Sequence, residues 1–205
     1  MGTSNIWFTA DLHFGHRGKP DGVIGGIIKH ASRPFKTIEE HDEYLIKRWN
    51  ETVDKHGIVY IIGDFAWRNP NHYVQALNGK KILITGSHDK MSQLNLHQFT
   101  SVYQGMLITT FNKIPFVLTH CSMRVWERSY YGAINLYGHS HGRLEEFPDR
   151  CQMDVGVDVA DDYAPFSLEF ILYKMSLKIK RDYQHSEPDK FVKINKENNL
   201  KLMEG

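Results

Sequence analysis

Five short apolar runs in the chain are each followed at once by side chains that bind metals or transfer protons. These are Asp11 and His13 after residues 5–10, Asp64 after 57–62, Ser87, His88 and Asp89 after 81–85, His120 after 115–119, and His139 and His141 after 134–137. Each run is too short for a buried helix and lacks clean alternation, which predicts a strand covered on both faces. Ligands of open α/β sheets bind beyond the carboxyl ends of the strands. We therefore expect these side chains to meet in one cluster.

The mixture of imidazole and carboxylate groups in this set indicates metal chemistry. A D-x-H or H-x-H step just past a strand places two donors toward one ion, and such donors suit Mn, Zn, Fe or Ni better than Ca or Mg alone. Six ligands exceed one tetrahedral site and suggest two ions, with Asp64 as the candidate bridging carboxylate. Two metals ~3.5–4 Å apart activate water against a phosphate ester. Taken singly, each motif also fits an ordinary turn.

Helical patterns alternate with the apolar runs. Thr37 and Glu40 form a capping-box pattern at the start of a helix predicted over residues 37–53. A second helix is predicted over 69–80, and the alternation of strand and helix indicates an α/β protein. Residues 21–36 are expected to form a long loop.

Bulk properties place the chain among ordinary globular proteins. Its 205 residues carry 25 Lys and Arg against 24 Asp and Glu, so the net charge of +1 gives no general basic field for wrapping nucleic acid; a local basic patch stays open. We expect a single domain over residues 1–184 and a polar, peripheral or mobile tail over 185–205. Cys121 and Cys151 show no metal-type spacing, and Cys121 is expected to pack inside. With no signal peptide or membrane segment expected, a cytoplasmic protein is predicted. Nothing specifies an oligomeric state.

In this order and spacing, the motifs resemble those of the calcineurin-like metallophosphoesterases, especially the small stand-alone bacterial and phage type. The matches are DLH at 11–13, GD at 63–64, GSHD at 86–89, TH at 119–120 and GHSH at 138–141. The resemblance implies a four-layer αββα sandwich, in which two facing mixed sheets are flanked by helices.

The resemblance also implies roles for the motif residues. The ligands of one metal would be Asp11, His13 and His141, and those of the second His120 and His139, with Asp64 bridging both. A bridging hydroxide would attack phosphorus in line. His88, held by Asp89, would protonate the leaving oxygen or stabilise the charged phosphoryl oxygens. An imidazole oriented by a carboxylate is indeed poised to act as an acid.

Ser87 departs from the family pattern. The family has an asparagine here, whose carbonyl oxygen binds the second metal, whereas a serine hydroxyl is a shorter and poorer ligand. The second site is therefore expected to be weaker or more selective. Natural tuning, partial loss of catalysis and an engineered substitution all fit this change, so a non-catalytic binding protein on the same scaffold is the rival function.

The leading hypothesis is a binuclear phosphoesterase with Mn²⁺ as the expected metal, and Zn, Fe or Ni as alternatives. It would act on a phosphomonoester or phosphodiester with a small or nucleotide-like substrate. Arg33 is a candidate for bidentate phosphate binding, and His16 for an extra ligand or phosphate contact; for both, an ordinary loop role is the alternative. Trp67 is expected in the core, and Asp158 either supports the site or belongs to a turn.

Overall fold

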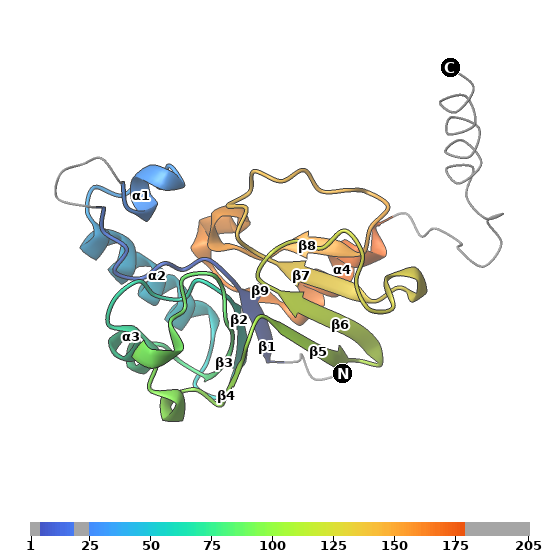
Figure 1. Cartoon of the computed structure of the whole chain (residues 1–205), viewed down its shortest axis with the longest axis horizontal. Helices are drawn as coiled ribbons and strands as arrows, with labels where there is room; N and C mark the ends of the chain where they lie inside the picture. Colours follow the sequence, from blue (N-terminus) through green and yellow to red (C-terminus); the bar gives the residue numbers. More distant parts are fainter. Residues whose placement is uncertain (1–4, 19–24, 179–205) are drawn as a thin grey trace, which may run out of the picture.

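Two mixed β-sheets face each other in the structure, a computed structural model that describes residues 5–18 and 25–178 (Figure 1). Among these residues, one sheet has five strands in the order β4-β3-β2-β1-β9 and the other has four in the order β5-β6-β7-β8. The first sheet contains β1 (Ile6–Thr9), β2 (Ile58–Ile62), β3 (Lys80–Ile84), β4 (Ser101–Tyr103) and β9 (Phe166–Ser167). The second contains β5 (Met106–Phe111), β6 (Ile114–Thr119), β7 (Ile134–Tyr137) and β8 (Gln152–Asp154). The helices are α1 (Ile27–His30), α2 (Ile38–Thr52), α3 (Pro70–Ala76) and α4 (Leu168–Ser176).

Strand direction brings the predicted strand ends to one edge. Strands β1 to β4 are mutually parallel, and β9 runs antiparallel to β1. Strands β6, β7 and β8 are also parallel, and β5 pairs antiparallel with β6. The five strands predicted from the apolar runs are β1, β2, β3, β6 and β7, so all five are confirmed, together with the expected α/β sandwich of two facing mixed sheets.

One apolar core fills the space between the two sheets. Phe8 of β1 lies parallel to Phe116 of β6 with ring centroids 6.2 Å apart, and it meets Phe111 of β5 edge-on at 5.4 Å. Buried residues of α4 close this core at one end. Each apolar side chain contributes about 1.5–3 kcal/mol to the free energy of folding when it is fully buried. The aromatic rings that pack between the sheets therefore hold the two sheets together.

A second core lies under α2 and α3 on the other face of the five-stranded sheet (Figure 1). The α2 helix begins as predicted, because the Thr37 hydroxyl oxygen accepts a hydrogen bond from Glu40 N at 3.2 Å. The Glu40 carboxylate accepts from Lys36 N rather than from Thr37 N, so only half of the capping box forms. Trp49 is fully buried, and its indole N–H donates to Asn78 O at 3.0 Å.

Some expectations about the outer segments need correction. The predicted loop over residues 21–36 contains α1, and the tail over 185–205 lies outside the described residues.

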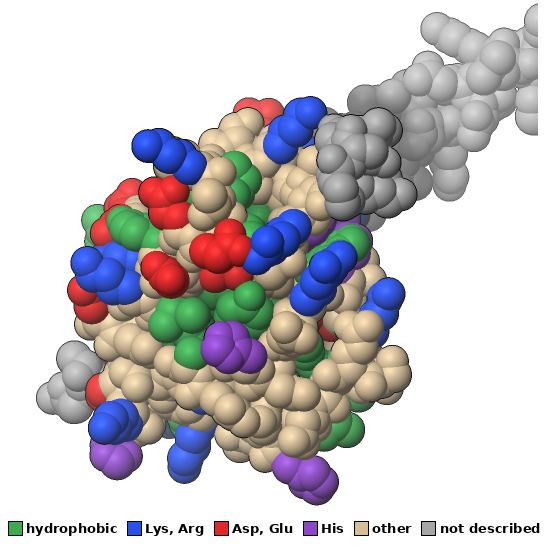
Figure 2. All heavy atoms as spheres, turned by 90° about the vertical axis from the view of Figure 1, so that its left-hand side faces the viewer, with side chains coloured by type: hydrophobic (Ala, Val, Ile, Leu, Met, Phe, Trp, Pro, Cys, Tyr) green, Lys and Arg blue, Asp and Glu red, His purple; other side chains and the backbone are tan. Residues whose placement is uncertain are grey.

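A loop carrying Trp126 covers the outer face of the four-stranded sheet at Val117. None of the helices in the described part combines the length and apolar character needed to cross a membrane. On the face drawn in Figure 2, basic and acidic side chains alternate without a broad patch of one sign, in keeping with the net charge of +1.

Candidate metal centre

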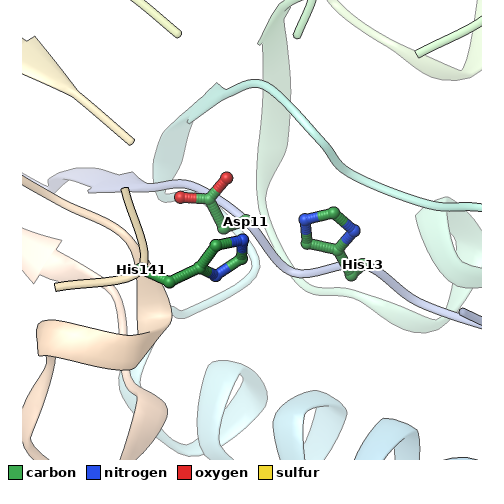
Figure 3. Close-up of side chains that lie close together, drawn as sticks. All are labelled: Asp11, His13 and His141. Carbon is green, nitrogen blue, oxygen red and sulfur yellow. The ribbon is translucent and has the colours of Figure 1, made fainter. Parts of the chain in front are cut away.

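Two groups of potential metal ligands lie side by side where the strands end. One consists of Asp11, His13 and His141, and the other of Asp64, His120 and His139. Within each group, the candidate ligand atoms all lie within 4.8 Å of one another. Figure 3 shows the first group, in which Asp11 and His13 from the segment after β1 face His141 from the loop after β7. The structure therefore brings together six side chains that are up to 130 residues apart in the chain (141 − 11).

The backbone of these segments adopts a conformation that non-glycine residues seldom take. Five of the six candidate ligands have a positive φ, namely Asp11 (58°), His13 (52°), Asp64 (51°), His139 (69°) and His141 (49°). Each such residue stores about 1–3 kcal/mol of strain, which persists only where the surroundings enforce it. Backbone hydrogen bonds from Asp11 N to Gly63 O and from His13 N to Asp64 O help to hold the loops after β1 and β2 together.

Asp64 lies between the two groups. Its Oδ2 is 3.5 Å from His13 Nε2 and 3.2 Å from His120 Nε2, while Oδ1 accepts from His88 N at 2.9 Å. Burial works to raise the pKa of Asp64, but the contact with His120 and the other neighbours outweigh it and hold the pKa below its usual range. A carboxylate that stays charged and faces both groups has the position of a bridging ligand.

Burial sets the protonation of the first group. It raises the pKa of Asp11 to about 7, against the lowering effect of His120 and His141. It also lowers the pKa of His13 to about 2, so this imidazole is neutral and keeps a lone pair for a metal. Asp11 Oδ2 accepts from His139 N at 2.7 Å, which leaves Oδ1 to face the cluster.

The unpaired atoms in this cluster fit metal ions. Asp11 Oδ1, His13 Nε2 and His120 Nε2 are buried and hydrogen-bond to nothing in the described part of the chain. The 3.2 Å approach of His120 Nε2 to Asp64 is an ion-pair distance without hydrogen-bond alignment. A buried polar atom without a partner costs about 1–3 kcal/mol. Three of them on facing imidazole and carboxylate groups make a donor set suited to borderline divalent cations.

Neighbouring groups fix which nitrogen each imidazole offers. His120 Nδ1 lies 3.0 Å from Ile62 O, and His141 Nδ1 lies 2.6 Å from Asp158 Oδ2. Because a carbonyl and a carboxylate only accept, Nδ1 carries a proton in both rings, so Nε2 is the nitrogen that each ring can offer to a metal. Asp158 thus supports His141, which is one of the two roles that the sequence left open.

Arg33 is not exposed where a substrate could reach it, contrary to what a phosphate-binding role requires. Its side chain is fully buried, and it donates to both carboxylate oxygens of Asp158 at 2.7 Å and to the backbone oxygens of Asp11 and Leu12 at 2.6 and 3.1 Å. These hydrogen bonds hold the Arg33 guanidinium against the backbone and the supporting carboxylate behind the candidate metal ligands. The contact with Arg33 and His141 lowers the pKa of Asp158 well below its usual range, although burial alone would raise it.

Asp89 does not orient His88, which corrects a second prediction. The Asp89 carboxylate accepts from the backbone N–H groups of Asp64, Phe65 and Gly86 at 2.8–2.9 Å, so it fastens the loop after β3 to the loop after β2. Among the described residues it makes no hydrogen bond to His88. The His88 side chain is 42% exposed, and its Nε2 is 3.8 Å from Asp64 Oδ2. His88 therefore faces the cluster from the solvent side.

Ser87 and His16 both lie beside the cluster. Ser87 Oγ is 3.4 Å from Asp64 Oδ2, which places the hydroxyl near the second group. His16 Nδ1 is 3.2 Å from His13 Nδ1, and burial lowers the pKa of His16 to about 4. Their predicted roles as a weak ligand and as an extra ligand or phosphate contact stay predictions.

Trp67 and Cys121 are not in the core, contrary to expectation. Trp67 is 38% exposed and lines a cleft of about 640 Å³ in front of the cluster. Cys121 is exposed next to His120. Besides Trp67 and four of the six candidate ligands, the residues that line the cleft include His16, His30, His88, Arg143 and Leu144. An open cleft with metal-binding side chains at its floor suits a substrate that approaches from solvent.

Comparisons with known proteins found relatives in sequence and a solved structure with a similar fold. The chain is 30% identical over 182 residues to an uncharacterized protein of Methanocaldococcus jannaschii, covering 84% of this chain and 92% of that protein. It is 28% identical over 189 residues to the gene 66 protein of Mycobacterium phage L5, covering 76% and 87% of the two. A solved structure of a protein of unknown function from Aquifex aeolicus matches this chain with a TM-score of 0.59 and 22% sequence identity. The matched region covers 82% of this chain and 97% of the Aquifex aeolicus chain. No protein-family model matches the chain.

The Aquifex aeolicus structure shares the fold of this chain, in which the predicted motif residues meet at one edge of the sheets. The chain belongs to the same family as the Methanocaldococcus jannaschii protein.

Proposed function

We propose that this protein is a binuclear metal-dependent phosphoesterase that hydrolyses a phosphomonoester or phosphodiester of a small or nucleotide-like compound. One observation carries the proposal: two complete groups of ligand atoms meet at Asp64, whose Oδ2 lies within 3.5 Å of an imidazole of each group. A shared carboxylate between two such groups is the arrangement that holds two cations close together.

The side chains of the chain would divide the work as follows. Two divalent cations bound by the two groups would supply an activated water and neutralise charge on the phosphate. Asp64 would keep the two ligand groups in register through its contacts with His13, His120 and the His88 backbone. His88, exposed in the cleft, would hold or donate the proton that the leaving oxygen needs. Because Asp89 makes no hydrogen bond to it, His88 would act without the orienting carboxylate that was expected for it, and the nearest carboxylate oxygen given for its Nε2 is Asp64 Oδ2 at 3.8 Å.

The choice of metal follows from the donor set. Four imidazoles and two carboxylates are the ligand types that suit Mn, Zn, Fe or Ni. We propose Mn²⁺ as the working metal, and the substrate site as the cleft of about 640 Å³ in front of it.

Turnover with defined metals tests this function. The metal-free protein is loaded with Mn²⁺, Zn²⁺, Fe²⁺ or Ni²⁺, and hydrolysis of p-nitrophenyl phosphate and of its bis ester is followed by absorbance. We expect about two ions per chain by elemental analysis, hydrolysis of at least one ester, and loss of activity with EDTA. Circular dichroism after EDTA should show most of the secondary structure retained. Two bound ions with no hydrolysis of either ester under any metal would contradict the proposal.

Ser87 supports the rival function, a non-catalytic binding protein on this scaffold. Its hydroxyl is close to Asp64 but is a poorer ligand than an amide oxygen. The Ser87→Asn variant separates the two functions. If the natural protein is inactive with Mn²⁺ and Ser87→Asn hydrolyses the esters, the rival function is correct; if the natural protein is already active, it is wrong.

A further inference from the structure

Trp67 lines two neighbouring hollows. One is the cleft in front of the candidate metal ligands, and the other is a hollow of about 390 Å³ lined by residues of the loop after β2 and the start of α3, together with Gln93. Trp67 lines both and is 38% exposed. Its backbone is fixed, because Trp67 N donates to Phe14 O at 2.8 Å next to the bridge between Phe14 and Ala66. The structure therefore holds a large aromatic side chain in solvent beside the proposed site.

Histidines of the cluster set the orientation of the indole. The His16 ring lies flat on it, with centroids 4.0 Å apart and an angle of 3° between the planes. His88 lies 4.6 Å away and is tilted by 49°. With one indole face covered by His16, a ligand can reach only the exposed part of the indole that His16 leaves open.

The second hollow is lined mainly by groups that hydrogen-bond. Besides Trp67 and Pro70, its lining residues are Arg68, Asn69, Asn71 and Gln93. The Arg68 and Gln93 side chains are exposed and hydrogen-bond to nothing among the described residues, and the Asn69 side chain does not cap α3. The side-chain oxygen Oδ1 of Asn71 accepts a hydrogen bond from Asn95 N at 2.8 Å, which leaves the side-chain N–H groups of Asn71 for another partner. Amide and guanidinium groups beside an aromatic face are the side chains that bind the edges of an unstacked nucleobase.

We propose that Trp67 and this hollow form a nucleobase subsite, so that the substrate is a nucleoside phosphate whose nucleoside is the leaving group. The inference rests on the proposed function, because it takes the phosphate to lie at the two ligand groups. His88, the residue proposed to protonate the leaving oxygen, contacts Trp67, so the leaving group extends toward the indole. The base stacks on Trp67, and its edge meets Arg68, Asn71 and Gln93.

A matched pair of substrates tests the subsite. Adenosine 5′-monophosphate and ribose 5-phosphate have the same phosphate linkage and the same leaving oxygen, and they differ at C1, where ribose 5-phosphate carries a hydroxyl in place of the base. Their methyl diesters extend the pair to diesterase activity. The quantity measured is the ratio of kcat/KM for the adenosine compound to that for the ribose compound, with the Mn²⁺-loaded protein. We expect a ratio of about ten or more in the natural protein, the size expected for one stacked base.

Variants then locate the origin of this ratio. Trp67→Ala should lower it by about tenfold, while Trp67→Phe, which keeps a stacking face, should retain most of it. Gln93→Ala, which lies away from the metal ligands, should lower it by about threefold, as expected for one lost hydrogen bond. Tyr131→Ala is the matched control, since Tyr131 is a 75% exposed aromatic residue that lines neither hollow. A ratio near one in the natural protein, or equal losses on both substrates in Trp67→Ala, would overturn the subsite.

Binding separates failure of the subsite from failure of the proposed function. Phosphonate analogues of the same pair, with a carbon in place of the bridging oxygen, are not hydrolysed, and their affinities are measured by calorimetry. If no ester is hydrolysed but the adenosine phosphonate binds about tenfold tighter and Trp67→Ala removes the difference, the subsite stands and the proposed hydrolysis is wrong. Equal affinities for the two phosphonates overturn the subsite whether or not the protein is active.

Discussion

Replacing Asp158 with asparagine removes one charge from a buried network without changing its shape. Asp158 is the one carboxylate that Arg33 contacts directly among the described residues, and the side chains of the two are 7% and 0% exposed. Asp158 also accepts from His141 Nδ1 at 2.6 Å. The variant therefore leaves a buried guanidinium uncompensated and places an amide where two donors require an acceptor.

The size of the effect follows from these contacts. Removing one partner of a buried ion pair costs about 3–5 kcal/mol, and because the amide oxygen can still accept one bond, we expect a loss of about 3 kcal/mol in the free energy of unfolding. Asparagine can also donate to His141 Nδ1, which would move the imidazole proton to Nε2 and block the metal-binding nitrogen. Loss of a group that orients a metal ligand lowers metal affinity by about 10–100-fold.

Urea unfolding of the metal-free protein and calorimetric titration with Mn²⁺ measure the two effects separately. The pKa of Asp158 is lowered from 3.8, so its charged form stabilises the folded state above pH about 4, and this contribution is lost as the pH falls through the folded value. The difference between the natural protein and Asp158→Asn should thus be constant near neutral pH and shrink below pH about 4. Asp161→Asn, an exposed neighbour without a hydrogen bond or ion pair to the described residues, is the control. A change below about 1 kcal/mol together with unchanged Mn²⁺ affinity would refute this reasoning.

The other predictions concern the metal ligands and the loops that carry them. Asp64→Asn should reduce both ions together, because its Oδ2 faces both groups; elemental analysis showing two retained ions would exclude a bridging role. His88→Ala should lower kcat by about 100-fold or more with nearly unchanged metal content, and a matching loss of metal would show that His88 is a ligand. The affinity for Mn²⁺ should fall about tenfold per pH unit from pH 9 to 7, because contacts with Asp64 and Asp11 outweigh burial and raise the pKa of His120 to about 9. It should fall more steeply below pH 7, because burial raises the pKa of Asp11 to about 7 and a second proton then competes with the metal. Titration calorimetry that finds no dependence of the affinity on pH would contradict these protonation states. Gly63→Ala should cost about 2 kcal/mol or more in urea unfolding, since Gly63 has φ +83° and an added Cβ would lie 2.8 Å from Gly86 Cα; a change under about 0.5 kcal/mol would show that the loop can relax.

Residue order alone predicted five of the nine strands in the described part of the chain and the helices α2 and α3, whereas the sandwich of two facing sheets was expected from the family resemblance. The runs that became β1, β2, β3, β6 and β7 were recognisable because strands covered on both faces are continuously apolar. The start of α2 was recognisable because a threonine hydroxyl satisfies a free backbone N–H of the first turn. By contrast, the segment 21–36 hid the four-residue α1, because so short a helix has no apolar periodicity to detect.

The predictions for single polar side chains were less reliable. Arg33 was expected to bind substrate and Asp89 to orient His88, whereas the first is buried on Asp158 and the second holds backbone N–H groups. Both errors have one cause. A charged residue beside a motif has the same sequence signature whether it points into the cleft or behind it, and only packing decides the direction.

The sequence by itself determined which donors reach the edge of the sheets, because parallel strands deliver the residues that follow them to one side. Only the tertiary structure decided how those donors are used. It set positive φ values at five of the six ligands, the Nδ1 contacts that free Nε2 of His120 and His141, and the exposure of Trp67. These features depend on atoms brought together from distant parts of the chain, so no local pattern of residues encodes them.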